Sequence, residues 1–156
     1  MHFPLAIVLG FFSANLLSQN LALAAVREAL RPQDTISRCV VSDPRSGHRF
    51  RPNCKEVIVR AGQRSSMSFN AEGLRDKNYS SKPAPGWTRI LLVGSSRMVG
   101  PGLAESETPP RRLESHLRKS LKKLEVINAS VEGYTPVQQA SRLKEWISAY
   151  SPTLVV

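Results

Sequence analysis

Residues 88–156 alternate between short apolar runs and segments of helical periodicity, and this alternation limits the possible folds more than any other feature. Apolar runs stand at 89–93, 124–128 and 153–156. The first of these runs is continuous up to Gly94, which is typical of a strand buried on both faces of a parallel sheet. Between them, residues 109–123 and 136–150 have the spacing of amphipathic helices. The order strand–helix–strand–helix–strand predicts an α/β fold in which helices cover a parallel sheet in αβα layers.

The pattern also predicts which residues are buried and where the helices begin. In the first helix, Leu113, Leu117 and Leu121 recur at i, i+4 and i+8. In the second, Thr135 is the expected N-cap and Pro136 the first helical residue. Its inward face is expected to carry Val137, Ala140, Leu143 and Ile147. Burial in adjacent parallel strands is expected for Leu91, Leu92, Val93, Val126, Ile127, Leu154 and Val155.

The first 24 residues have the composition of a targeting segment. Leu5 to Leu17 is mostly apolar but spans about 13 residues, fewer than the ~20 needed to cross a bilayer. Ala22 and Ala24 form the small-x-small pattern that precedes a cleavage site. We expect residues 1–24 to be an export signal, with a retained N-terminal anchor or a buried helix as alternatives. The expected location is secreted or periplasmic, with membrane attachment only if the segment is retained.

Residues 25–86 carry turn signals at short spacing, and a strand is expected only at 56–59. The segment therefore predicts an irregular N-terminal extension packed onto the domain at 87–156. Cys39 and Cys54 suit an exported chain, and a disulfide between them would contribute about 3 kcal/mol. Two separate thiols are the alternative. A metal site using both cysteines and His48 lacks a fourth ligand, so no metal is expected.

A serine motif follows the first apolar run: Gly94-Ser95-Ser96-Arg97-Met98-Val99-Gly100. A side chain just beyond the carboxyl end of a parallel strand lies where open α/β sheets bind ligands. Gly94 allows a tight turn, and the amides that open the next helical turn lack partners and favour negative charge. Taken alone, the motif is a weak signal and is more typical of an ordinary strand-to-helix turn.

The residues around this motif extend the pattern over 43–156. The run 90–100 is followed by Gly102-Leu103, the run 126–134 contains Gly133, residues 70–76 read Asn-Ala-Glu-Gly-Leu-Arg-Asp, and 146–156 leads into a third strand. Together they resemble the SGNH (GDSL-type) esterase and lipase family. The resemblance implies a flavodoxin-like three-layer αβα sandwich, hydrolysis of small esters or of acylated glycans or lipids, and no cofactor.

Carried over residue by residue, the resemblance makes Ser96 the nucleophile and the N–H groups of Ser96 and Gly133 the oxyanion donors, supported by the turn residues Gly94, Ser95 and Gly100. Ser95 replaces the family's Asp, and a serine can brace the turn only in part. The family's oxyanion Asn and late Asp-x-x-His have no counterpart before Val156. We therefore expect 87–156 to be the N-terminal part of such a domain, truncated and unable to complete the hydrolytic cycle.

Neither remaining histidine is expected to replace the missing base. His116 falls on the first helix, and His48 stands among arginines in the extension. The alternative function is a non-catalytic relative that binds acyl or glycan groups. The net charge of +10 attracts anions, but the basic residues are not interleaved with aromatic ones, so no specific nucleic-acid partner is expected.

Overall fold

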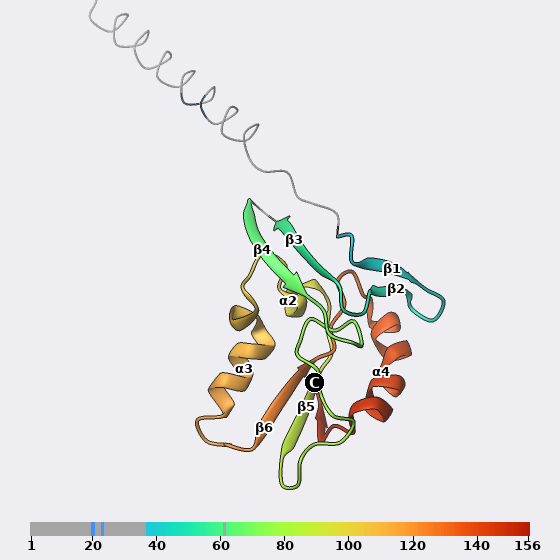
Figure 1. Ribbon diagram of the computed structural model, residues 1–156, viewed down its shortest axis with the longest axis vertical. Coiled ribbons are helices and arrows are strands. Elements are labelled where there is room, and N and C mark those ends of the chain that lie inside the picture. Colours follow the sequence, from blue (N-terminus) through green and yellow to red (C-terminus); the bar gives the residue numbers. More distant parts are fainter. Residues whose placement is uncertain (1–19, 21–22, 24–36, 61) are drawn as a thin grey trace, which may run out of the picture. The chain divides into compact units, whose positions relative to one another are not determined.

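The computed structural model describes residues 20, 23, 37–60 and 62–156 (Figure 1). The expected targeting segment 1–24 lies outside these residues except for Asn20 and Leu23. No helix of the described part is long and apolar enough to cross a membrane. The elements of residues 37–156 are β1 (Val40–Asp43), β2 (Gly47–Phe50), β3 (Lys55–Arg60), β4 (Gln63–Ser68), β5 (Thr88–Leu92), α2 (Ser96–Val99), η1 (Glu105–Glu107), α3 (Pro109–Leu117), β6 (Leu124–Asn128), α4 (Pro136–Tyr150) and β7 (Leu154–Val155).

The three apolar runs form one parallel sheet in the order β6-β5-β7. Leu91 of β5 lies opposite Ile127 of β6 on one side and Val155 of β7 on the other. β5, the first strand of this sheet along the chain, is thus its central strand. The connection after β5 leads to one edge of the sheet, and the connection after β6 leads to the opposite edge. The expected parallel arrangement is confirmed, and the fold is mixed α/β with a small parallel sheet and antiparallel hairpins.

Helices α3 and α4 cover opposite faces of this sheet (Figure 1). Side chains of successive strand residues point to opposite faces, so each strand contributes to two clusters. The cluster on the α4 side includes Leu91, Ile127, Trp146 and Tyr150. The cluster on the α3 side includes Ile90, Leu92, Val126, Leu113 and Leu117. The predicted layering is therefore present in the described residues.

Two of the residues expected in the core are exposed. Leu154 and Val155 of β7 keep 51% and 37% of their surface accessible. β7 pairs with β5 on one side only, and within the described residues no element covers its other edge. The apolar run correctly predicts a strand, but burial depends on neighbours that a local sequence pattern does not specify.

The inward face of α4 differs from the prediction. Its capping box, in which Thr135 and Gln138 bond each other's backbone N–H, confirms the expected start. However, Ala140 is exposed, and Val137 and Ile147 keep 78% and 42% of their surface accessible. The buried residues are Arg142, Trp146 and Tyr150, with Leu143 half-buried. The physical reason is an ion pair of 2.8 Å between Arg142 and buried Asp43, which turns this polar side chain inward.

Helix α3 ends earlier than the leucine spacing predicts. It stops at Leu117, and Leu121 lies beyond it with 45% of its surface exposed. Arg118 donates its Nε–H to Leu124 O at 2.7 Å, which ties the chain leaving the helix to the start of β6. The last leucine of the i, i+4, i+8 series therefore belongs to the connecting turn.

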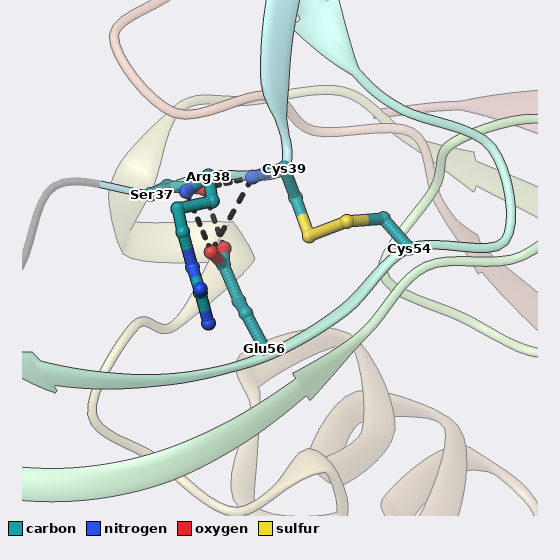
Figure 2. Close-up of a disulfide and its surroundings, with 5 residues drawn as sticks. All are labelled: Ser37, Arg38, Cys39, Cys54 and Glu56. Carbon is teal, nitrogen blue, oxygen red and sulfur yellow. Dashed lines mark hydrogen bonds between the residues drawn. A yellow bond between two sulfur atoms is a disulfide. The ribbon is translucent and has the colours of Figure 1, made fainter.

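The segment before the sheet is more ordered than its turn signals indicate. It contains two antiparallel hairpins, β1-β2 and β3-β4, where the sequence predicts a single strand. A disulfide joins Cys39 to Cys54, with their Cα atoms 5.8 Å apart (Figure 2). The Glu56 carboxylate accepts hydrogen bonds from the Arg38 and Cys39 N–H groups and from the Ser37 hydroxyl. These contacts attach the start of β1 to β3.

Removing this disulfide is expected to lower the free energy of unfolding by about 3 kcal/mol, because the 15-residue separation of its cysteines sets the chain entropy regained on unfolding. The variant Cys39→Ala/Cys54→Ala, compared with the oxidised wild type by urea denaturation, measures the difference. An unchanged denaturation midpoint would show that the disulfide does not stabilise the hairpins.

Candidate active site

The serine motif forms the turn between β5 and α2. Ser95 precedes the helix in extended conformation (φ −116°, ψ −154°), and Ser96 is the first helical residue. A Cβ at Gly94 would lie 2.7 Å from Met98 Cγ and 3.3 Å from Ser130 Oγ. Glycine suits this position because the Met98 and Ser130 side chains approach it closely.

The loops after β5 and β6 continue side by side beyond the strand ends. Ala129 N–H donates to Leu92 O at 2.9 Å, and Val131 N–H donates to Gly94 O at 3.2 Å. Both bonds prolong the parallel ladder of the two strands. Ser96 and Gly133 each follow the last bonded pair by two residues, at the same edge of the sheet.

Several polar groups of these loops have no hydrogen-bond partner within residues 37–60 and 62–156. They include the hydroxyl groups of Ser95 and Ser96, which are half-buried, and the N–H of the exposed Gly133. Ser95 therefore does not brace the turn through its side chain, although partial bracing was expected. Ser130 is fully buried behind Gly94, and its hydroxyl also lacks a partner.

Residues 70–76 form a tight loop whose last two residues, Arg75 and Asp76, contact the segments around the serine turn. Asn70 Oδ1 accepts the N–H groups of Glu72 and Leu74, both at 2.9 Å, which closes a tight loop. Gly73 in this loop has φ +78°, and a Cβ there would lie 2.3 Å from Phe50 O. Only glycine fits, because the backbone of β2 passes directly over it.

Arg75 holds the chain that leaves α2. Its guanidinium, 2% exposed, donates to the carbonyls of Val99 at 2.8 Å, Gly100 at 2.5 Å and Leu103 at 2.7 Å. Burial lowers the pKa of the Arg75 guanidinium from its usual value. These carbonyl acceptors, with Ser66 O at 3.4 Å as a fourth, compensate in part for the loss of water, and the bonds fix the segment that follows the serine turn.

Asp76 connects the same support to β6. Its Oδ2 accepts the Asn128 N–H at 2.8 Å and pairs with Arg111 at 3.1 Å, while its Oδ1 accepts the Tyr79 hydroxyl at 3.0 Å. Asn128 in turn donates its Nδ2–H to Met98 O in α2. Burial and the neighbouring Asp76 charge raise the pKa of Tyr79, which keeps this hydroxyl a donor. The sequence indicates these residues only through the resemblance at 70–76.

His48 lies beside the loop that carries Gly133, which the sequence does not predict. Its Nε2 is 2.7 Å from Glu132 O, and a Cβ on Gly133 would lie 3.7 Å from its ring. His48 and Glu132 are 84 residues apart, and no local pattern links them. His116 is exposed on α3, as expected for a surface helix histidine.

A scan against protein-family models finds no match for this chain, and a search of curated proteins finds none either. Within the described residues, no group of three or more His, Cys, Asp and Glu could hold a metal ion.

Proposed function

We propose that this chain carries the nucleophile and oxyanion donors of an SGNH-type serine ester hydrolase. The observation that supports the proposal most is the pairing of the loops after β5 and β6, which continues to Gly94 and Val131. It puts the Ser96 hydroxyl and the unpartnered Gly133 N–H beyond the same strand ends. On this proposal, the order β6-β5-β7 is the beginning of a flavodoxin-like sheet, whose binding crevice lies at such a reversal of strand order.

In the proposed reaction, Ser96 Oγ attacks the ester carbonyl carbon and a base takes its proton. The carbonyl oxygen becomes an oxyanion that accepts hydrogen bonds from the N–H groups of Ser96 and Gly133. As this intermediate collapses, the base returns the proton to the leaving oxygen, so the C–O bond to the alcohol breaks and an acyl-serine remains. Water, deprotonated by the base, then attacks the acyl carbon, and the carboxylic acid leaves as the proton returns to Ser96 Oγ. The substrates we propose are small esters or acylated glycans or lipids.

An extracytoplasmic location belongs to the same proposal. The Cys39–Cys54 disulfide supports it, because such bonds persist in oxidising compartments. The positive net charge would favour anionic surfaces in that setting.

A second candidate function is non-catalytic binding of acyl or glycan groups. It is favoured by the unpartnered Ser96 hydroxyl, since within the described residues no histidine bonds to it. A serine without a base in hydrogen-bond reach is a poor nucleophile.

A biotinylated alkyl fluorophosphonate in imidazole buffer separates the two functions. The probe is expected to modify Ser96, as mapped by peptide mass spectrometry, because the oxyanion donors stabilise the phosphonylation transition state. Ser96→Ala should abolish the adduct, and Ser95→Ala, which changes the adjacent hydroxyl, should retain it. Two results would contradict the hydrolase proposal: the absence of an adduct on Ser96, or modification of Ser95 and Ser96 to the same extent.

A further inference from the structure

The loop that carries Gly133 is a tight turn with a defined peptide orientation. Tyr134 N–H donates to Val131 O at 3.3 Å, Gly133 has φ +78°, and the φ of Glu132 is not positive. This combination is typical of a type II turn. Its middle peptide joins the Glu132 carbonyl to the Gly133 N–H, and in a trans peptide these two groups point in opposite directions. Whatever holds the carbonyl therefore also directs the N–H.

His48 holds that carbonyl. Its Nε2 lies 2.7 Å from Glu132 O, and because a carbonyl oxygen only accepts, Nε2 must carry the proton. The imidazole also packs edge-on against the Tyr134 ring, with ring centroids 5.1 Å apart. The Gly133 N–H consequently faces away from the imidazole, and it has no partner within the described residues.

The hairpin that bears His48 is held at two further points, one in this turn and one in α4. The Tyr134 hydroxyl lies 2.6 Å from Ser46 Oγ and 2.7 Å from His48 O. Gln138 of α4 donates its Nε2–H to Ser46 O at 2.7 Å. The β1-β2 hairpin thus contacts the turn at Glu132 and Tyr134 and also bonds α4, so His48 does not depend on a single contact for its position.

We propose that His48 is a positioning residue that orients and polarises the oxyanion donor Gly133. A hydrogen bond to the carbonyl of a peptide strengthens the N–H of the same peptide as a donor. This inference rests on the proposed function and assigns to the β1-β2 hairpin a part in catalysis. It also separates His48 from the role of general base, because its contribution is the Nε2–H bond.

Two substitutions distinguish a donor from a base. His48→Gln retains an N–H donor at similar reach but has no basic nitrogen, and His48→Phe keeps a ring but removes the donor. For His48→Phe, the rate constant for fluorophosphonate modification of Ser96 should fall roughly tenfold or more, part of the ~10²–10³-fold cost of deleting an oxyanion donor. His48→Gln should stay within about threefold of wild type, because its amide donates to the same carbonyl.

Tyr134→Phe is the matched control. It removes the other anchor of the turn and leaves the His48 bond to Glu132 in place, so it should lower stability without a comparable loss of rate. Equal losses for His48→Gln and His48→Phe would overturn the proposal in favour of a base. If the modification rate of His48→Phe were unchanged, or if Tyr134→Phe lost as much rate as His48→Phe, His48 would be only a structural contact.

Nuclear magnetic resonance of ¹⁵N-labelled protein that has not reacted with the fluorophosphonate keeps this inference separate from the proposed function. The Gly133 ¹⁵N shift, which responds to hydrogen bonding of the preceding Glu132 carbonyl more than to the loss of a neighbouring ring, should change in His48→Phe and remain near its wild-type value in His48→Gln, whether or not Ser96 is modified. In the wild type, long-range ¹⁵N spectra should show the His48 proton on Nε2. A proton on Nδ1 alone would overturn the inference even if His48→Phe did not fold, while failure of Ser96 labelling alone would overturn only the proposed function.

Discussion

Asp76→Asn is expected to lower the free energy of unfolding by about 3–5 kcal/mol, the usual cost of removing one partner of a buried ion pair. Each carboxylate oxygen of Asp76 accepts two hydrogen bonds. Oδ1 accepts the Lys77 N–H and the Tyr79 hydroxyl, and Oδ2 accepts the Asn128 N–H and the Arg111 guanidinium. An asparagine must direct its NH₂ group at one of these donor pairs, in either orientation of its amide.

The same substitution should loosen the serine turn, because Asp76 holds Asn128 and Asn128 bonds Met98 O in α2. Urea denaturation measures the stability, and Glu107→Gln is a suitable control. Glu107 is exposed in η1, so this variant should lie within about 0.5 kcal/mol of wild type. If Asp76→Asn were as stable as Glu107→Gln, the buried network would not support the fold.

Free imidazole is expected to accelerate hydrolysis of p-nitrophenyl acetate by the wild-type chain through Ser96. Within the described residues, His48 is bonded to Glu132 O and His116 is exposed on α3, so neither is a partner of the Ser96 hydroxyl. A positioned general base contributes about 10²–10⁴-fold, and a dissolved one should restore part of this factor. Without imidazole we expect little turnover.

Ser96→Ala should reduce the rate to that of imidazole alone, and Ser95→Ala should keep most of the acceleration. The initial rate as a function of imidazole concentration gives the comparison for all three proteins. Ser96-dependent turnover that needs no imidazole would mean that the chain already supplies a base. Equal acceleration of wild type and Ser96→Ala would mean that Ser96 is not the nucleophile.

Features encoded by neighbouring residues were predictable from the sequence. The apolar run of β5 and the Thr135-Pro136 start of α4 are examples, because periodicity and capping act over a few residues. The face that α4 buries was not predictable in this way, because the ion pair from Arg142 to Asp43 joins residues 99 positions apart. Exposure of Leu154 likewise follows from its place at a sheet edge.

The candidate site divides in the same way. The turn at Ser96 and the loop at Gly133 follow from short motifs placed after strands. The supporting contacts do not. Arg75 and Asp76 reach backbone groups of distant segments, and His48 lies against Glu132 because the β1-β2 hairpin packs against α4. Such contacts depend on tertiary packing, which no spacing in a single sequence specifies.

The central claim is that the Ser96 nucleophile and the Ser96 and Gly133 oxyanion donors form one site. A crystal structure of the chain modified by the fluorophosphonate tests this claim most directly. We predict the phosphorus bonded to Ser96 Oγ, with the phosphonyl oxygen about 2.7–3.1 Å from the Ser96 and Gly133 nitrogens, as in an oxyanion hole. In the same structure, His48 Nε2 should still bond Glu132 O. An adduct whose phosphonyl oxygen points to solvent, with the Gly133 N–H turned away from it, would contradict this account.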